Sequence, residues 1–153
     1  MIMRIGSPDS ALAWGALLLF VLYISAAFVL RSVLQYLRTG DAGFRGISGP
    51  VGSSRWWAGV LFVLALVAGV FGPVAALLGL EPIKVLTTHD VQAPAVVAAV
   101  VGIVCTVLAQ LEMGSSWRIG VREGEGTALV TNGFFAVVRT PIFTAMAITG
   151  AGL

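Results

Sequence analysis

Charged side chains are scarce in this chain. Nine Lys or Arg and seven Asp or Glu occur among 153 residues, whereas 58% of the residues are hydrophobic. A typical soluble domain is about 25% charged, so this composition excludes a globular domain with a water-facing surface. We therefore expect an integral membrane protein whose partner is the lipid bilayer, and the length allows a single domain, residues 1–153.

Cysteine and histidine are nearly absent as well. The only cysteine is Cys105, which excludes an intrachain disulfide, and the only histidine is His89. Because no Cys/His spacing suits a metal ion, we expect no metal. The basic residues are dispersed and form no Lys/Arg cluster, so we also expect no nucleic-acid partner.

In place of charge the chain has long apolar runs. A helix needs about 20 residues to cross about 30 Å of hydrocarbon. Apolar segments at about 11–30, 57–80 and 94–113 predict three full transmembrane helices, and one at about 134–153 predicts a fourth. The fourth has only 13 residues from Pro141 onward, so we expect it to be truncated. The predicted fold class is an all-α integral membrane helical bundle.

The arginines predict how these helices are oriented. The loops on one side carry seven arginines, and the other side carries only Arg4 and Lys84. The positive-inside rule then puts the N-terminus outside and the loop 114–140 in the cytosol, and we expect the plasma membrane. The seven arginines are Arg31, Arg38, Arg45, Arg55, Arg118, Arg122 and Arg139.

Small residues four apart occur in the second and third predicted helices. Such pairs let helices approach closely in lipid, although the pattern also arises by chance in an alanine-rich chain. Each pair is therefore a candidate helix contact. The pairs are Ala65 and Gly69, Ala68 and Gly72, Ala95 and Ala99, and Ala98 and Gly102.

Several polar features have two interpretations each. Glu112, at the end of the third helix, is either a functional acid in the membrane or an interfacial residue that contacts headgroup water. His89 and Asp90 would need a third partner for catalysis, and none is visible; Asp90 alternatively caps the third helix. The loop 31–55 either sets orientation and contacts anionic lipid, or lines a cytosolic entrance to a site.

The most informative segment is Trp117–Phe143, which lies between two apolar stretches and holds five of the charged residues. Polar groups that collect against a bilayer often mark the functional site, because burying them elsewhere is costly. Composition alone also fits a solvated loop with an interfacial hairpin.

The residues of this segment match a known pattern. The run LVTNGFFAVVRTPIF at 129–143 resembles the LVTxGxYxxVRHPxY signature of the isoprenylcysteine carboxyl methyltransferase family, which related membrane phospholipid methyltransferases share. The preceding GSSWRIG at 114–120 is similar to a GxSWRIG segment of bacterial members. The resemblance is close over 114–143 and covers the helical layout more loosely.

The resemblance implies a compact helical membrane enzyme that uses S-adenosylmethionine. The cofactor pocket would open to the cytosol, and a hydrophobic small-molecule or lipidated acceptor would arrive from the bilayer. By this resemblance the cofactor-binding residues would be Leu129, Val130, Thr131, Gly133, Arg139, Pro141 and Phe143.

Two departures from the family pattern matter. Thr140 stands where the family has histidine, and Phe143 where it has tyrosine, which removes a possible imidazole contact to the cofactor. Family members also continue past this point with a further helix and a closing C-terminal segment. The expectation is therefore a truncated form or a partial sequence, and whether this form is active stays open.

Methyl transfer to a carboxylate needs alignment and exclusion of water but no strong general base, so no catalytic residue is identified. Arg139 would suit the carboxylate of the cofactor through paired hydrogen bonds, and Glu123 or Glu125 would suit its ribose hydroxyls. The acceptor stays open between a prenylated cysteine, a lipid amine and a small hydrophobic acid. Two other functions remain: a non-catalytic membrane module or scaffold, and an NADPH-dependent oxidoreductase related to sterol reductases.

Overall fold

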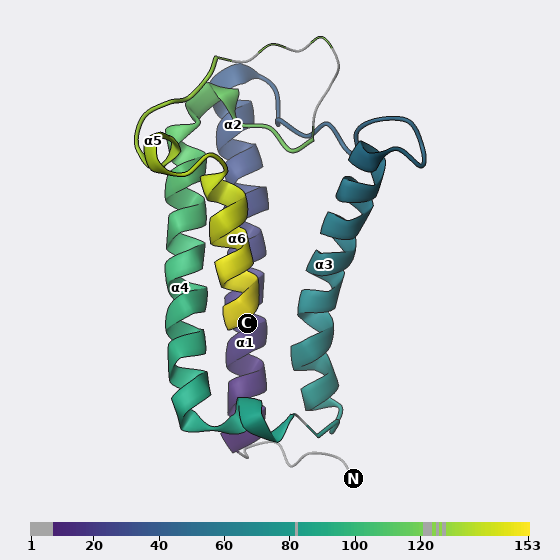
Figure 1. The fold of residues 1–153 in the computed structure, drawn as a ribbon, viewed down its shortest axis with the longest axis vertical. Coiled ribbons are helices and arrows are strands. Elements are labelled where there is room, and N and C mark those ends of the chain that lie inside the picture. The colour runs from purple at the N-terminus through teal and green to yellow at the C-terminus, as the bar shows by residue number, and fades with distance from the viewer. Residues whose placement is uncertain (1–7, 82, 121–123, 125, 127) are drawn as a thin grey trace.

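The structure of the protein is a computed structural model that describes residues 8–81, 83–120, 124, 126 and 128–153. These residues form an all-α bundle without a β-strand (Figure 1). Glu123 and Glu125, the candidates for a ribose contact, lie outside the described residues. The elements in chain order are α1 (Pro8–Ile24), the π-helix η1 (Ser25–Leu30), α2 (Arg31–Thr39), α3 (Ser54–Leu77), the 3₁₀-helix η2 (Lys84–Thr87), α4 (His89–Glu112), the 3₁₀-helix η3 (Gly114–Ser116), α5 (Phe134–Val137) and α6 (Pro141–Gly152).

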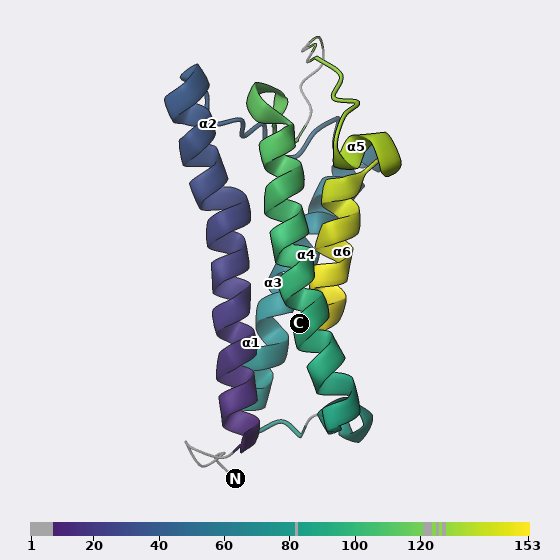
Figure 2. The same ribbon diagram turned by 90° about the vertical axis from the view of Figure 1, so that its left-hand side faces the viewer.

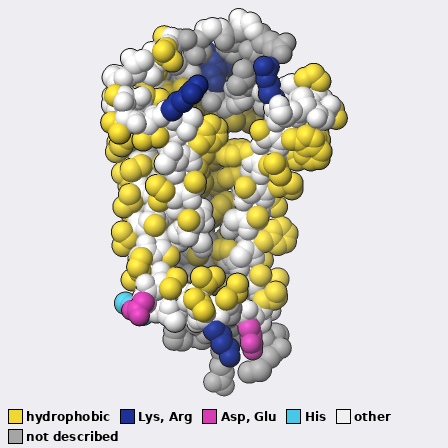
Figure 3. All heavy atoms as spheres, viewed as in Figure 1, with side chains coloured by type: hydrophobic (Ala, Val, Ile, Leu, Met, Phe, Trp, Pro, Cys, Tyr) yellow, Lys and Arg dark blue, Asp and Glu magenta, His cyan; other side chains and the backbone are white. Residues whose placement is uncertain are grey.

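Three helices are long and apolar enough to cross a membrane: Ser10–Thr39, Ser54–Leu77 and His89–Glu112. The described part of the chain is therefore an all-α membrane bundle, as the apolar runs predict. On the face shown in Figure 3, hydrophobic side chains cover the middle of the bundle, and the coloured charged side chains lie toward its two ends. The apolar helix α6 has 12 residues, so it spans only about 18 Å.

The first helix is longer than the apolar run at 11–30. It continues through η1 and α2 to Thr39, where Gly40 ends it in a left-handed conformation at φ +73°. Arg31 therefore lies on a helix and not in the expected loop. Arg31 and Gln35 are both buried, because this extension of the helix packs against the end of α4.

Local signals set the ends of α3 and α4. Helix α3 begins after Ser53, whose hydroxyl accepts a hydrogen bond from the Trp56 amide at 3.2 Å. It ends near Gly79, which has φ +90°, and so stops short of residue 80. Helix α4 begins at His89, ahead of position 94, because a polar turn with Asp90 precedes the apolar run.

The expected helix at 134–153 is divided in two. Helix α5 ends at Val137, and α6 begins at Pro141. Thr140 has φ −132° and ψ 63°, outside the helical region. A residue before proline is disfavoured in the helical conformation, so the Thr140–Pro141 step accounts for the break. The break turns the chain so that Arg139 lies between the two helices.

Small residues hold α6 against α4, which run side by side in both ribbon views (Figures 1 and 2). A Cβ added at Gly102 would lie 2.7 Å from the Thr149 amide nitrogen and 2.9 Å from the Ala145 carbonyl oxygen. Gly152 likewise meets the backbone of Ala95 and Ala99. Three of the predicted small positions, Ala95, Ala99 and Gly102, thus contact α6.

Helix α3 packs differently, against α1 and through an aromatic ring. A Cβ at Gly69 would lie 2.6 Å from Cε2 of Phe20. A chain of ring contacts continues from Phe20 through the bundle to α3 and α6, with centroid separations of 6.1 to 6.5 Å. Its members are Phe20, Tyr23, Phe28, Phe62 and Phe143.

Candidate functional site

A cavity of about 1140 Å³ lies between α3 on one side and α4 and α6 on the other. The space-filling view shows a recess with hydrophobic walls between α3 and the other two helices (Figure 3). Most of its lining is apolar, from Phe28, Phe44, Ile47, Phe62, Val63, Leu66, Met113, Trp117, Ile119, Phe135, Ile142, Phe143 and Met146. Such a cavity has room for an apolar chain together with a polar group.

Three arginines line the same cavity: Arg55, Arg118 and Arg139. Each belongs to the end of the bundle that carries residues 40–53, 114–120 and 128–140, which we call the loop end. Arg55 lies in the first turn of α3, Arg118 follows η3, and Arg139 lies in the break before α6. One end of a mainly apolar cavity is therefore cationic, which suits an anionic group on a hydrophobic molecule.

The two loops of the loop end are joined through their backbones. The Arg45 amide donates to the Ile119 carbonyl and the Ile119 amide donates to the Gly43 carbonyl, both at 2.8 Å. This isolated parallel bridge fixes residues 43–48 beside residues 117–120. The loop 40–53 therefore contributes Phe44, Gly46, Ile47 and Ser48 to the cavity wall.

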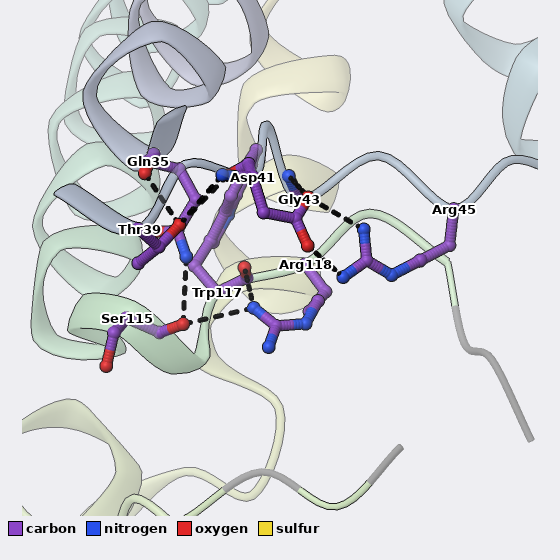
Figure 4. Close-up of polar contacts among 8 residues, drawn as sticks. All are labelled: Gln35, Thr39, Asp41, Gly43, Arg45, Ser115, Trp117 and Arg118. Atoms are coloured by element: carbon purple, nitrogen blue, oxygen red, sulfur yellow. Dashed lines mark hydrogen bonds and ion pairs between the residues drawn. The ribbon is translucent and has the colours of Figure 1, made fainter. Parts of the chain in front are cut away.

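An ion pair supports the same loop (Figure 4). Asp41 accepts a hydrogen bond from Arg45 Nη1 at 2.9 Å and another from the Gly43 amide at 2.8 Å. The Arg45 guanidinium, and then the Gly43 amide, hold the pKa of the Asp41 carboxyl well below its usual range. The pair therefore keeps its charge at every physiological pH.

The side chain of Arg31 connects α2 to the end of α4. Its Nε and Nη2 donate to the Gln110 carbonyl at 3.3 and 3.2 Å, and Nη2 also donates to the Gly114 carbonyl. The guanidinium lies 4.9 Å from the ring centroid of Trp117. The carbonyls at the C-terminal end of a helix lack partners within the helix and favour a cation, so Arg31 caps α4.

Gln35 completes this cap one turn further along α2. Its Oε1 accepts from Arg31 Nη1 at 3.3 Å, and its Nε2 donates to the Ser115 carbonyl at 2.8 Å, as the close-up shows for Ser115 (Figure 4). Arg118 donates to the same carbonyl at 3.0 Å. The segment 114–118 is thereby held in place, and Trp117 is buried and lines the cavity.

Gln110 is the functional candidate that sequence reasoning missed. It is 2% exposed, lines the cavity and donates from Nε2 to the Ala27 carbonyl at 3.0 Å. Its Oε1 is the one buried side-chain oxygen or nitrogen without a hydrogen-bond partner among the described residues. A glutamine within an apolar transmembrane run was the available signal, because polar groups at this depth are costly.

Glu112 holds the turn that precedes α5. Its Oε2 accepts from the Phe134 amide at 2.8 Å. Gly133 has φ +57°, and a Cβ there would overlap the Glu112 carboxylate. Only glycine fits this position, and Glu112 satisfies a free amide at the start of α5. The structure thus gives Glu112 a specific contact with the start of α5 at the loop end.

The residues expected to bind the cofactor fall into two groups. Arg139, Pro141 and Phe143 line the cavity, together with Thr140. Leu129, Val130, Thr131 and Gly133 do not line it, and Leu129 is 86% exposed. The break before α6 therefore brings the second half of the motif to the cavity, while the first half lies on the surface of the loop end.

His89 and Asp90 lie at the N-terminal end of α4, at the opposite end of the bundle from the loop end. Neither lines the cavity. Among the described residues, no three His, Cys, Asp or Glu side chains come close enough together to hold a metal ion.

Comparisons with protein-family models, with curated proteins and with solved structures give no match to this chain.

Proposed function

We propose that this protein is an S-adenosylmethionine-dependent membrane methyltransferase that acts on a lipid-like acceptor. The observation that carries the proposal is the convergence of Arg139, Pro141 and Phe143 on one large, mainly apolar cavity at the loop end. These residues form the RTPIF part of the run that resembles the isoprenylcysteine carboxyl methyltransferase signature. An apolar cavity with a cationic end suits a polar cofactor beside a hydrophobic acceptor.

The residues present fit the proposed cofactor in charge and in size. Pockets for drug-sized ligands typically have volumes of about 300–1,000 Å³, so a cavity of about 1140 Å³ has room for the cofactor and part of an acceptor. Arg139 would hold a carboxylate through paired hydrogen bonds. Phe135 and Phe143 would lie against the apolar surfaces of the ligands, since both line the cavity.

When bound, S-adenosylmethionine supplies an electrophilic methyl group on a sulfonium. The chain's own residues would orient both ligands and exclude water, which are the requirements for an in-line displacement. A carboxylate acceptor is already ionised at neutral pH, so no general base is needed. The apolar wall from Phe62, Phe143 and Met146 would keep water from the reacting atoms.

We also propose that the loop end faces the cytosol, that the N-terminus lies outside and that the membrane is the plasma membrane. The support is the arginine content of the loop end, which the positive-inside rule assigns to the cytosol. In a Cys105→Ser background, Thr87→Cys should react with an impermeant maleimide on intact cells, and Val51→Cys only after permeabilisation. Both positions are exposed. The reverse labelling pattern would overturn the orientation.

Isothermal titration of the purified protein with S-adenosylmethionine tests the function. We expect measurable binding, and we expect Arg139→Ala to weaken it about 10- to 100-fold, as for a lost charge-assisted hydrogen bond. Arg38→Ala is the matched control, because Arg38 is an exposed arginine of the same end that does not line the cavity. Absence of heat with S-adenosylmethionine would reject the proposal.

A second candidate function is an NADPH-dependent membrane oxidoreductase. The observation that favours it is the presence of three arginines in the cavity wall, since guanidinium groups bind phosphates well. Titration with NADPH under the same conditions separates the two functions. Heat with neither cofactor would favour a non-catalytic membrane module.

A further inference from the structure

The first long helix extends beyond the hydrocarbon at the loop end. Its uncharged run 11–30 covers about 30 Å, which is the thickness of the hydrocarbon. Helix α2 (Arg31–Thr39) adds nine residues, or about 14 Å. Arg31 lies level with the end of α4, because its guanidinium bonds the Gln110 and Gly114 carbonyls. Helix α2 therefore passes through the headgroup layer, which is only about 5–8 Å deep on each side.

Helix α2 is apolar on the side that faces away from the bundle. Its polar side chains Arg31 and Gln35 are buried and bond to the end of α4 and to η3. Val33, Tyr36 and Leu37 are exposed, and their spacings of three and four place them on one face of the helix. An apolar patch outside the hydrocarbon marks a contact with a membrane or a protein, and tyrosine is enriched at the membrane–water interface. This face of α2 is therefore a contact surface.

Three further side chains at the same end are even more exposed. Val51 is 84% exposed, and Leu129 and Val137 are each 86% exposed, the highest values for large hydrophobic side chains in the described part of the chain. Glu112 holds α5 at the end of α4 by accepting from the Phe134 amide. Val137, at the end of α5, therefore lies near the boundary of the hydrocarbon, as does the outer face of α2.

Net positive charge accompanies these apolar side chains. The described residues from α2 to the first turn of α3 and from Glu112 to Thr140 include six arginines and two acids. The arginines are Arg31, Arg38, Arg45, Arg55, Arg118 and Arg139. Of the acids, Asp41 forms an ion pair with Arg45, and Glu112 is bonded to α5. Six positive and two negative charges leave an excess of four positive charges at this end.

We propose that the loop end is a docking surface for anionic phospholipids of the leaflet around it. A basic surface with apolar side chains beside it is typical of segments that bind anionic membranes. On α2 the acyl chain would lie against Val33, and the phosphate would lie near Arg38, which is exposed and about 8 Å further along the helix. The excess positive charge favours a lipid with a net negative charge over phosphatidylcholine, whose headgroup is neutral overall.

This surface is separate from the cavity. Val33, Arg38 and Val137 do not line the cavity, so the binding of anionic lipid involves neither the cofactor nor an acceptor. The inference therefore stands or fails independently of the proposed function.

Quenching by lipids with the same acyl chain and different headgroups isolates the charge preference. In a Cys105→Ser background, Val33→Cys at the loop end and Leu12→Cys near the other end of the same helix are each labelled with the fluorophore NBD. Both positions are exposed. The protein is reconstituted in phosphatidylcholine nanodiscs that contain, at equal mole fraction, either phosphatidylglycerol or phosphatidylcholine with a nitroxide on the acyl chain near the headgroup.

We expect phosphatidylglycerol to quench the label at Val33→Cys about fivefold more effectively than phosphatidylcholine, the effect of one arginine near an anionic headgroup. At Leu12→Cys the ratio should be about one, because Glu81 and Asp90 offset Lys84 at that end. A ratio of one at both positions would overturn the proposal.

Removing the charge tests the role of Arg38. Arg38→Gln should lower the ratio at Val33→Cys at least twofold, whereas the matched control Lys84→Gln, at the opposite end, should leave it unchanged. Raising the salt concentration from 0.1 to 1 M shortens the screening length from about 10 to about 3 Å and should also lower the ratio without any change of charge in the protein. A ratio that survives both treatments would show that the arginines do not select the lipid.

A label at Val137→Cys tests the occupant of the surface. We expect both nitroxide lipids to quench it, and phosphatidylglycerol to quench it more. Absence of quenching by either lipid would place this side chain against a protein, either a partner or a second copy of the chain, and would overturn the proposal.

Discussion

The α4–α6 contact and the α1–α3 contact are both built around a glycine, but the partner of the glycine differs. Gly102 of α4 faces the backbone of α6 at Ala145 and Thr149, whereas Gly69 of α3 faces the ring of Phe20 on α1. A backbone cannot move without moving its helix, whereas a ring can rotate about its own side-chain bonds. The wall that carries Gln110, Pro141 and Phe143 is therefore rigid, and the α3 wall of the same cavity is adaptable.

This difference suits a cavity that must hold a polar group in a defined place beside a variable apolar chain. The Arg31 cap further fixes the end of α4, next to Gln110. On the other wall, α3 contributes the apolar side chains of Phe62, Val63 and Leu66. Hydrogen bonds from Arg31 therefore hold the α4 wall of the cavity in place at the loop end.

The largest effect should come from Gly102→Ala. Its new methyl group would overlap the backbone and hydroxyl of Thr149, so α6 must move away, and we expect a loss of about 3 kcal/mol of unfolding free energy. The measurement is the unfolding midpoint in mixed SDS micelles. Gly72→Ala on α3 is the control, since a Cβ there meets nothing within 4 Å and should be neutral or stabilising by up to about 1 kcal/mol. Equal effects of the two variants would end the distinction between the walls.

Arg31→Met should cost about 2 kcal/mol, because the Gln110 and Gly114 carbonyls lose a charged donor. The same unfolding assay measures the loss, and the fluorescence of Trp117 should change as the guanidinium leaves its ring. Arg38→Met, on the exposed part of α2, should stay within about 0.5 kcal/mol. A loss at Arg38 as large as that at Arg31 would indicate a general charge effect and not a cap.

Gly133→Ala should cost about 1–2 kcal/mol, because alanine resists φ +57° and its Cβ displaces the Glu112 carboxylate. Hydrogen exchange should then be faster in the segment 132–137, where the Phe134 amide loses its acceptor. Gly126→Ala is the control in the same loop, where a Cβ has open space. Unchanged exchange at Phe134 would show that Glu112 does not hold this turn.

Gly69→Ala should cost about 1 kcal/mol, less than Gly102→Ala, because only the end of the Phe20 ring is in the way. A double-mutant cycle with Phe20→Leu makes this quantitative. In the Phe20→Leu background the cost of Gly69→Ala should disappear. A cost that persists would place the obstacle in the backbone, and the α3 wall would then be as rigid as the α6 wall.

The smallest effect concerns pH and the Asp41–Arg45 pair. Hydrogen bonds from Arg45 lower the pKa of the folded Asp41 carboxyl, so its contribution is complete above the unfolded pKa, near 4, and is lost as the pH falls below it. Asp41→Asn should therefore differ slightly from wild type at pH 7 and converge with it only at strongly acid pH. The unfolding midpoint from pH 7 to pH 2 measures this. Convergence already at pH 5 would contradict a lowered pKa.

Much of the fold could be predicted from the sequence because membrane helices follow from local composition. The three apolar runs became the three long helices. The position of Arg31 could not be predicted in this way, because the positive-inside rule treats every arginine as a loop marker. Arg31 is stabilised by carbonyls about 80 positions away in the chain, and such acceptors leave no local signal.

The candidate site could be predicted only where its residues are marked by a local sequence signal. The proline at 141 marks the break that brings Arg139 to the cavity, and this signal is local. Gln110 is visible in the sequence as a polar residue within an apolar run. The sequence does not show that its Nε2 bonds to the Ala27 carbonyl while its Oε1 has no hydrogen-bond partner. That information exists only once α1 and α4 lie side by side.

The π-helical turn at Ser25–Leu30 determines which side chains before and after it share one face of the helix. Tyr23, Ala27, Arg31 and Gln35 are all buried, at strict intervals of four. In a regular α-helix such a row drifts by about 40° at each step, and the wider π turn corrects this drift. The π turn thus acts as one inserted residue. Deleting a single residue between 25 and 30 would rotate Arg31 and Gln35 by about 100° relative to Phe20. The residues before and after the deletion could then not all face the neighbouring helices at once.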